Sequence, residues 1–459
     1  MSCDATTTNP VIIATGEKVK PETDFIAQGL YAIELTRTYR SKNSTSNVFG
    51  PNWPSSFDAI RLLYSTQSCR MIDNVCYPLS ATATEPNGAQ YKYSLIGGTE
   101  EYRVYGSASK GTLYYMGAGA WELVRGDTTF TFNSAGRVTS KTVGGATLTY
   151  TYVSGKLTNV QNLVGQNVTL TYTGSRVTSI ADPGGNTWAY TYNANGMLET
   201  VTSPGSSPDI RRYHYEVASA PTLLTGISIN NVRYSTYSYL ADKRVQESGL
   251  AGGEERDTFV YGTNQTTVTS AAGQPITYSF TTINGAMMPS AVSRAGTATC
   301  AASASQTVYD PNGYLDYQLD WKGNKTDYTY VADGKLMNVT SAAGTAAAKS
   351  RYFTWAGDDI VEVSWRDANG TPYAKVQYAY TFLSGLGVRP SSEIWTDVRT
   401  GAVRQTTYAY TTHASGAVAT MTATRSLPTG NAVSTTSYDA LGNMLSATNA
   451  SGHQTTWSN

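Results

Sequence analysis

Side chains that could act as catalysts or metal ligands are few in this sequence. Its three histidines, His214, His413 and His453, lie among Thr, Tyr and Ser residues, without partners at the spacing of a metal site or a catalytic triad. The carboxylates of Glu100-Glu101 would point to opposite faces of a strand, which does not suit acid–base catalysis at one bond. The residues therefore predict no catalytic site and no metal site, and we expect a protein that is not an enzyme.

Two further stretches resemble ligand-binding loops but lack a defining residue. The segment Gly106–Thr112 has the composition of a phosphate loop, yet its lysine precedes the second glycine and no helix is predicted after it. Asp310, Asn312, Asp316 and Asp320 are rich in oxygen donors, but they lack the spacing and the closing Glu of a calcium loop. We expect these side chains to cap turns, and we predict no cofactor.

The cysteines allow one disulfide. The chain has four of them, and only Cys69 and Cys76 are spaced so that they could face each other across a hairpin. Spacing does not fix the geometry that a disulfide needs. A bridge between these two residues and a pair of buried thiols therefore both remain open.

Most of the chain consists of copies of one strand-and-turn unit, of which Tyr309–Tyr330 is the clearest. In Tyr328-Thr-Tyr330 the alternation of a strand places both rings on one face. Asp310-Pro-Asn-Gly313 favours a type I turn closed by a glycine bulge, because Asp can accept from a backbone N–H two residues later and Gly permits positive φ. The signature residues of the repeat are Tyr309, Asp310, Gly313, Tyr328, Tyr330, Gly334, Tyr438, Asp439 and Gly442.

The spacing of the copies predicts the fold class. Regular copies at Tyr150, Tyr172, Tyr190, Tyr309 and Tyr328 start 18 to 22 residues after one another within each run. That length holds two short strands and two turns, and it leaves no room for a crossover helix, so the sheet should be antiparallel. We predict an all-β protein with a loose N-terminus over 1–8, a β-rich N-terminal domain over 9–127, and about fifteen repeats over 128–459.

The composition excludes several classes of partner. The chain has 33 basic and 33 acidic residues, so no net charge favours nucleic acid or an anionic membrane. No apolar run is long enough for a membrane span, and no N-terminal signal peptide is recognisable. Tyrosine is abundant, with 34 copies against 9 of Phe, so a wall lined by its rings could be wetted or could bind.

The repeats and the opening resemble the Rhs/YD-repeat family, which includes teneurins and the shell component of insecticidal toxin complexes. Tyr309-Asp310 and Tyr438-Asp439 match the motif that names the family. The opening, with Ala14-Thr-Gly16-Glu-Lys18 and Leu35-Thr-Arg-Thr-Tyr39, is similar to the domain that precedes the repeats in bacterial Rhs proteins.

This resemblance implies a β-ribbon that spirals into a hollow shell around a C-terminal toxin and is loaded into a secretion or injection machine. The sequence departs from the family in one respect: its Asp-Pro-x-Gly motifs, at Asp182 and Asp310, are mid-chain turns and not the closing element of a shell. We therefore expect a fragment or one part of a larger assembly. Its partners would be a toxin cargo or a further shell segment, and a secretion-apparatus protein is a further candidate. The expected location is secreted or at the cell surface.

Two functions follow as hypotheses. The first is a structural container or scaffold whose inner wall is lined by tyrosine rings, and the second is a carbohydrate-binding adhesin in which exposed tyrosines stack on sugars. The tyrosines expected on the inner wall are Tyr150, Tyr152, Tyr190, Tyr192, Tyr328 and Tyr330.

Overall fold

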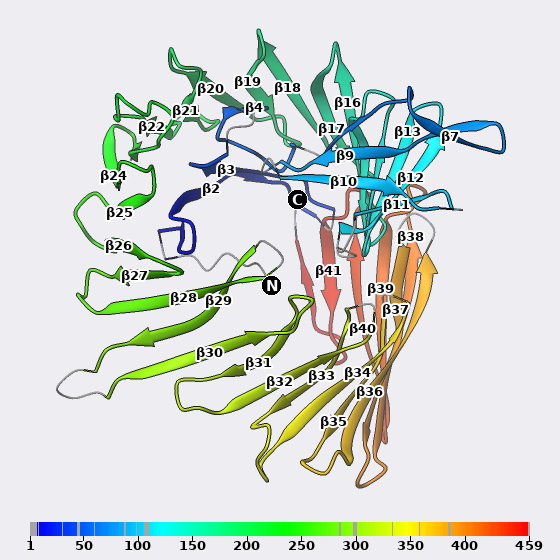
Figure 1. The fold of residues 1–459 in the computed structure, drawn as a ribbon. Coiled ribbons are helices and arrows are strands. Elements are labelled where there is room, and N and C mark those ends of the chain that lie inside the picture. Colours follow the sequence, from blue (N-terminus) through cyan, green and yellow to red (C-terminus); the bar gives the residue numbers. More distant parts are fainter. Residues whose placement is uncertain are drawn as a thin grey trace.

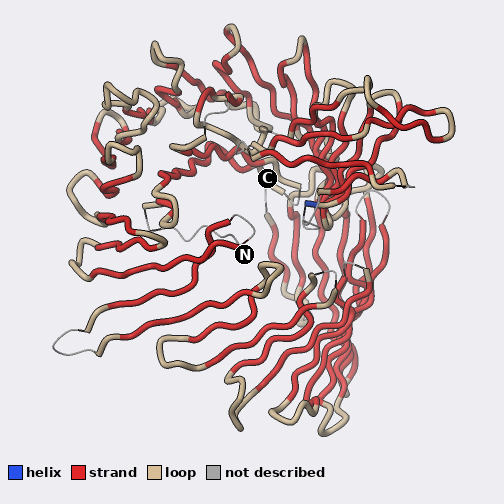
Figure 2. The backbone as a smooth tube through the Cα atoms, viewed as in Figure 1, coloured by secondary structure: helices blue, strands red, loops and turns tan. Residues whose placement is uncertain are grey.

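The protein consists of strands and turns. The computed structural model describes residues 7, 9–29, 31–43, 46–58, 60–86, 89–97, 99–104, 110–283, 286–296, 301–332, 334–357, 359–383 and 387–457, and no α-helix occurs among them. Figure 2 shows strands along almost the whole backbone, with the turns gathered at their ends.

The bounds of the first fifteen strands are β1 (Val11–Ile12), β2 (Glu17–Ile26), β3 (Glu34–Arg40), β4 (Ser46–Asn47), β5 (Gly50–Pro51), β6 (Arg61–Tyr64), β7 (Cys69–Ile72), β8 (Val75–Pro78), β9 (Ser80–Thr84), β10 (Gln90–Leu95), β11 (Glu101–Arg103), β12 (Thr112–Gly117), β13 (Ala120–Arg125), β14 (Thr128–Phe132) and β15 (Val138–Val143). The next fourteen are β16 (Ala146–Val153), β17 (Lys156–Asn162), β18 (Asn167–Thr173), β19 (Arg176–Ala181), β20 (Thr187–Tyr192), β21 (Leu198–Thr202), β22 (Ile210–His214), β23 (Gly226–Ile229), β24 (Val232–Tyr239), β25 (Val245–Leu250), β26 (Asp257–Gly262), β27 (Gln265–Thr269), β28 (Pro275–Ile283) and β29 (Ala286–Arg294). The last are β30 (Ser303–Tyr309), β31 (Leu315–Leu319), β32 (Lys325–Tyr330), β33 (Leu336–Ser341), β34 (Lys349–Ala356), β35 (Asp359–Arg366), β36 (Pro372–Leu383), β37 (Gly387–Asp397), β38 (Val403–Thr412), β39 (Val418–Leu427), β40 (Gly430–Tyr438), β41 (Met444–Thr448) and β42 (Gln454–Thr456).

One antiparallel sheet contains most of these strands. It starts at β6, which pairs with β9, and from β9 each strand pairs with the next as far as β42. A bridge between Arg61 and Arg137 joins β6 back to the start of β15, so the first strands form a small ring. No ladder among the described residues joins β42 to β6, and the long sheet is therefore open. The predicted all-β antiparallel fold is confirmed.

The long sheet curls into a wide turn. In Figure 1, β16–β20 lie at the top, β21–β29 at the left, β30–β36 at the bottom and β37–β41 at the right. The curled sheet comes back on itself where the start of β37 meets the turn between β15 and β16, because the Arg389 guanidinium donates to the Gly144 carbonyl at 2.8 Å. Residues that lie 245 positions apart in the sequence are thus joined at one seam.

Ladder lengths alternate along the sheet. The β18–β19 hairpin pairs from Thr169↔Ala181 to Thr173↔Arg176, whereas the β17–β18 ladder covers only Asn159–Gln161 and Asn167–Thr169. Hairpins within a repeat are therefore long, and junctions between repeats are short. Beyond each short ladder the two strands separate and leave a wedge in the wall.

A tyrosine fills these wedges. Tyr172 donates its hydroxyl to the Leu157 carbonyl at 2.7 Å, and Tyr192 donates to the Val177 carbonyl at 2.8 Å. Each acceptor lies beyond the short ladder, where it would otherwise lack a main-chain partner. The same bond recurs from Tyr215 to Leu198, Tyr239 to Leu224, Tyr261 to Val245, Tyr309 to Pro289, Tyr380 to Ile360 and Tyr410 to Pro390.

A basic residue packs on the face of several of these rings. The cations of Lys156 and Arg176 lie 5.6 and 5.4 Å from the ring centres of Tyr172 and Tyr192. Each basic residue directly precedes the acceptor of the hydrogen bond, so a Lys/Arg–apolar dipeptide holds the ring by its face and its hydroxyl. We call this arrangement the tyrosine clasp. It explains why the second ring of most pairs is tyrosine, although Phe132 and Phe280 occupy this position in two of them.

The turns have the predicted chemistry. Asp310 Oδ1 accepts from the Asn312 N–H at 3.0 Å and from the Tyr314 N–H at 2.8 Å. Gly313 has a φ of 86°, which a residue with a Cβ rarely adopts. The Asp439–Asn443 turn repeats this pattern, with Asp439 Oδ1 accepting from the backbone N–H of Leu441 and Asn443.

A separate hairpin, β7–β8, projects from the upper right of the molecule in Figure 1. Cys69 and Cys76 are joined by a disulfide within it, and their Cα atoms are 5.4 Å apart. The sheet also runs without a break through the predicted domain boundary at residue 127, since β13 pairs with β14 from Trp121↔Phe132 to Arg125↔Thr128. The division into domains stays a prediction.

Candidate functional site: the concave face and its N-terminal cover

The paired tyrosines of the repeats face the concave side of the sheet. In Figure 1, β2 and β3 lie inside the curve, next to β18–β25. Tyr190 and Tyr213 reach this N-terminal segment, because the Tyr190 hydroxyl donates to Asp24 Oδ2 at 2.9 Å and the Tyr213 hydroxyl accepts from Arg37 at 3.2 Å. The concave face of these repeats is therefore covered by residues 9–60.

A buried ion pair forms the centre of this contact. Arg37 of β3 donates to both carboxylate oxygens of Asp24, at 2.7 and 2.6 Å, and its side chain has no exposed surface. Four aromatic rings surround the guanidinium, with ring centres 5.2–5.8 Å away, and they belong to Phe49, Trp53, Tyr190 and Tyr213. Two of the rings come from the N-terminal segment and two from the repeats, so the cluster joins these two parts of the chain.

Further contacts continue the cover along the sheet. Lys18 is buried, donates to Ser248 Oγ at 3.0 Å and lies 4.0 Å from the ring centre of Tyr237. Burial lowers the pKa of the Lys18 ammonium well below its ordinary value. Tyr39 donates to the Thr222 carbonyl at 2.8 Å and accepts from the Leu224 N–H at 3.0 Å.

Tyr31 extends the cover to the far end of the sheet. Its carbonyl accepts from Asn162 at 2.7 Å, and its hydroxyl accepts from the Val418 N–H at 3.5 Å. Its ring packs with Val164 and Ala417 in one apolar cluster. A single N-terminal residue therefore contacts an early and a late turn of the repeat sheet.

The expectation of a tyrosine-lined open wall is wrong for the first half of the sheet. Tyr150 is 5% exposed and Tyr190 2%, because N-terminal side chains pack on them. Burial raises the pKa of Tyr190 well above its ordinary value and that of Tyr152 to about 12. These rings are thus part of an apolar core, which the sequence pattern alone does not distinguish from a lumen.

The second half of the sheet has a different surface. Tyr328, Tyr378 and Tyr408 are only half-buried, whereas their counterparts Tyr150, Tyr190 and Tyr213 are buried. Trp365 and Trp395 stack on the same side, with ring centres 5.3 Å apart and planes at 22°. The concave face from β30 to β41 therefore carries aromatic side chains that solvent still reaches.

The signature residues have structural positions in the repeats. Tyr309 and Tyr438 end β30 and β40, each at a β-bulge, and Gly313, Gly334 and Gly442 have φ near 80–90°. Tyr328 donates to Gln318 at 3.1 Å, and Tyr330 stacks on Tyr314 with ring centres 5.0 Å apart. These contacts join neighbouring parts of the repeat sheet, so they account for the structural role of the signature residues.

One constellation has the residue types of a hydrolase triad. His214 Nε2 lies 2.8 Å from Ser228 Oγ, and its Nδ1 lies 3.9 Å from Glu216 Oε1. Burial lowers the pKa of His214, and hydrogen bonds from Arg233 and Thr225 lower that of Glu216 to about 2. Ser228 is 5% exposed and pairs with Arg212, so its side chain points to the convex face and Tyr213 points to the concave face. The Ser228 hydroxyl is thus a largely buried member of a hydrogen-bond network with His214.

The structure also bears on metal ligands and on membrane-spanning helices. In the described ranges, no three His, Cys, Asp or Glu side chains form a set of metal ligands. Across the same residues, no helix is long and apolar enough to cross a membrane. The loose segment 1–8 except residue 7, Cys3, Cys300 and residues 106–109 of the loop resembling a phosphate site lie outside the described residues.

Sequence reasoning missed the residues that hold the cover. Asp24 and Arg37 lie within the opening that matched the family, yet their partners Tyr190 and Tyr213 follow 166 and 176 residues later. The available signal is charge: Asp24 and Arg37 occupy alternating strands that otherwise contribute to a core. A buried charge requires a partner, so such residues predict an interface.

Two segments of the chain match known protein families. The family described as "Domain of unknown function (DUF6531)" matches residues 8–76, and the RHS Repeat family matches residues 165–208. No curated protein matches the chain.

Among solved structures, the chain is similar to the crystal structure of TcdB2-TccC3-Cdc42, with 10% identity, a TM-score of 0.40, and coverage of 95% of this chain and 25% of that one. The crystal structure of TcdB2-TccC3 gives 11% identity, a TM-score of 0.39, and coverage of 95% and 26%. The chain thus spans about a quarter of the length of these structures. The DUF6531 match at the start of the chain and the RHS Repeat match within its curved sheet confirm, over these two segments, the predicted resemblance to the Rhs/YD-repeat family.

Proposed function

We propose that this chain is a non-enzymatic wall segment of an Rhs-type shell that encloses or presents a toxin cargo. The observation that carries the proposal is the difference between the two halves of the concave face. Tyr190 is 2% exposed beneath the N-terminal cover, whereas Tyr378 and Tyr408 are half-buried on an uncovered surface. The covered half would close one end of the enclosed space, and the uncovered half would contact the cargo.

The uncovered surface suits a poorly folded polypeptide. Its aromatic rings offer apolar contact area and polar tips, which tolerate many partner sequences. Charged groups also line it, since Glu393 pairs with Tyr378 and Arg404 with Trp395 in the cross-strand register. Contacts of this kind would restrain a cargo without requiring one defined fold.

We also propose that the protein acts outside the reducing cytosol, secreted or at the cell surface. The disulfide between Cys69 and Cys76 supports this location, because such bonds persist in oxidising compartments. A further shell segment, or a secretion-apparatus protein, would be its other partner. For the adhesin hypothesis, only the second half of the sheet could offer tyrosine rings to a sugar, since the rings of Tyr150 and Tyr190 are packed against protein.

The experiment uses reduced, carboxymethylated α-lactalbumin as a permanently unfolded cargo. Fluorescence anisotropy should show saturable binding to the full chain. Tyr378→Glu should weaken binding at least tenfold, because it places a charge on the concave face. Ala379→Glu is the matched control, because Ala379 is the next residue on the same strand and faces the opposite side. Equal losses in both variants, or no binding, would count against the proposal.

A further inference from the structure

A cavity of about 530 Å³ lies where the N-terminal cover meets the first repeats. Phe57 and Ile60 line it from the cover, and Tyr152 and Tyr172 line it from β16 and β18 of the repeats. Small-molecule sites in proteins have volumes of about 300–1,000 Å³. The cavity is therefore large enough for a ligand of modest size, and its charged side chains indicate which kind.

Three cations line this cavity. Arg61 and Arg137 are partners in an antiparallel bridge, so their side chains leave the same face from directly opposed positions. Like charges placed in this way repel each other. Lys156 adds a third positive charge, and its ammonium donates to the neutral Gly174 carbonyl, which leaves that charge uncompensated.

Two carboxylates also line the cavity, but both are held by other groups. Glu85 accepts from Arg125, which is not part of the lining, at 2.9 Å. Asp58 accepts from the Val48 N–H at 2.9 Å, and from the N–H and the hydroxyl of Ser55 at 2.7 Å each. These carboxylates are thus directed to partners other than the three cations.

The cations have no acidic partner within the described ranges. No ion pair there includes Arg61, Arg137 or Lys156. An anion placed between the two arginines would remove their mutual repulsion. The arrangement therefore favours an anionic ligand.

A tyrosine hydroxyl is available beside these cations. The Arg137 guanidinium packs on the Tyr152 ring, 5.7 Å from its centre, as the basic residue does in the tyrosine clasp. Tyr172 completes its clasp by donating to the Leu157 carbonyl. The Tyr152 hydroxyl makes no such bond to any described residue, so it can donate to a ligand in the cavity that it lines.

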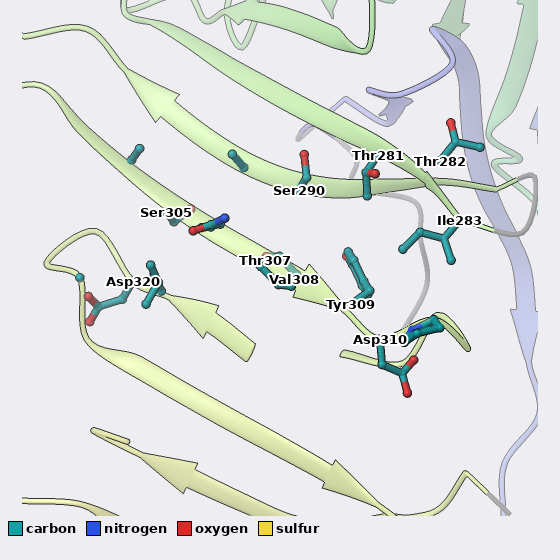
Figure 3. Close-up of a pocket in the computed structure, with 16 residues that line it drawn as sticks. Thr281, Thr282, Ile283, Ser290, Ser305, Thr307, Val308, Tyr309, Asp310 and Asp320 are labelled. Carbon is teal, nitrogen blue, oxygen red and sulfur yellow. The ribbon is translucent and has the colours of Figure 1, made fainter. Parts of the chain in front are cut away.

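A larger cavity, of about 1000 Å³ between β29 and β30, lacks these features. The charged residues that line it are Asp310 and Asp320, and Figure 3 shows them at opposite ends of the lining. Each accepts from backbone N–H groups of its own turn, so both act as turn caps. Cations without acidic partners thus distinguish the cavity beside Arg61.

We propose that the cavity beside Arg61 and Arg137 binds a small organic phosphate. Guanidinium groups match phosphate oxygens in a bidentate geometry, and three cations suit a dianion better than a single carboxylate. The Tyr152 hydroxyl would donate to the same group, and Phe57 and Ile60 would contact the organic part. This inference goes beyond the proposed function, because a wall can enclose a cargo without holding a small molecule.

The experiment titrates the full chain by isothermal calorimetry with phenyl phosphate and with inorganic phosphate. Both should bind saturably, and phenyl phosphate should bind more tightly because its ring contacts the apolar lining. Phenol should show no measurable binding, and benzoate should bind about tenfold more weakly than phenyl phosphate, since it carries one negative charge. The proposal is overturned if neither phosphate binds, or if phenol or benzoate binds as tightly as phenyl phosphate.

Two variants locate the binding in this cavity. Arg137→Met should weaken phenyl phosphate binding about tenfold, the effect of losing a charged hydrogen-bond donor. Tyr152→Phe should weaken it about three- to fivefold without changing the urea midpoint, because the hydroxyl it removes has no partner in the protein.

Arg366→Met is the matched control for the loss of charge. Arg366 also packs on a tyrosine ring, 4.5 Å from the centre of Tyr352, and it does not line the cavity. Its substitution should leave phosphate binding unchanged. Equal affinities of the Arg137→Met and Arg366→Met proteins, or an unchanged affinity in Tyr152→Phe, would place the binding elsewhere and overturn the proposal.

Discussion

Tyr190 donates its hydroxyl to the Asp24 carboxylate at 2.9 Å, across 166 residues of sequence. A tyrosine that the repeat pattern places on an inner wall is therefore part of the contact that holds the N-terminal segment. The same carboxylate is paired with Arg37, which Tyr213 also contacts. The ion pair, and not the apolar surface alone, fixes where the cover lies on the repeats.

Arg37→Met should destabilise the protein by about 3 kcal/mol or more, because it leaves the Asp24 carboxylate buried without its cation. The free energy of unfolding, from urea denaturation followed by tryptophan fluorescence, measures this effect. Arg103→Met is the control, because the Arg103–Glu101 pair is exposed and should contribute less than about 1 kcal/mol. Similar losses of unfolding free energy in both variants would show that the buried ion pair contributes no more to stability than an exposed one.

The tyrosine clasp predicts a cost for removing a single oxygen. Tyr192→Phe should destabilise by about 1 kcal/mol, since the Val177 carbonyl loses its donor. Tyr234→Phe should have almost no effect, because Tyr234 is 46% exposed and points to the opposite face of β24 from the buried Tyr237. Denaturation midpoints of the two variants provide the comparison. If Tyr192→Phe leaves the denaturation midpoint unchanged, the stabilising part of the clasp is the packing of the ring and not the hydrogen bond of the hydroxyl.

The local features of this fold could be predicted from the sequence, and the long-range ones could not. The Asp310–Gly313 turn depends on hydrogen bonds within four residues, so its residue types determine it. The clasp joins residues about 15 apart, as in Tyr172 and Leu157. Its Gly-Lys-Leu element recurs in the sequence at Gly155–Leu157 and Gly334–Leu336, but its residue types do not indicate which tyrosine it holds. The pairing of Arg37 with Tyr213 has no local signature, because either residue also suits a solvated strand.

The seam predicts a difference between two glycines of equal conformation. Gly387 and Gly401 have φ of 71° and 74°, so alanine is strained at both. Only at Gly387 would the added Cβ lie 3.0 Å from the Gly144 carbonyl oxygen, whereas at Gly401 it meets no atom within 4 Å. Gly387→Ala should therefore increase hydrogen exchange in the Gly144-Gly145 turn, and Gly401→Ala should not.

Asp58 predicts a dependence of stability on pH. Its carboxylate accepts from the N–H groups of Val48 and Ser55, and burial raises its pKa to about 6. The folded state thus binds the proton more tightly than the unfolded chain, whose value is near 3.8. Stability from this group is fully present below about pH 3.8 and is lost as the pH rises through 6, by an amount on the order of 3 kcal/mol.

The Asp58→Asn variant isolates this contribution, because an amide keeps an acceptor oxygen but cannot titrate. Urea denaturation between pH 4 and 7 should show the parent protein losing stability relative to the variant as the pH rises. Other carboxylates titrate in both proteins, so their effects cancel in the difference. A difference that stays constant over this range would mean that Asp58 keeps the same charge throughout.

The Ser228–His214 pair predicts an absence of hydrolase chemistry. A neutral imidazole 2.8 Å from a serine hydroxyl could act as a general base, but Ser228 is 5% exposed. A fluorophosphonate probe should therefore leave Ser228 unmodified in the folded protein, as measured by mass spectrometry of its peptides. Labelling of Ser228 that disappears in His214→Ala would instead show an activated nucleophile, and the convex face would then need to open to admit a substrate.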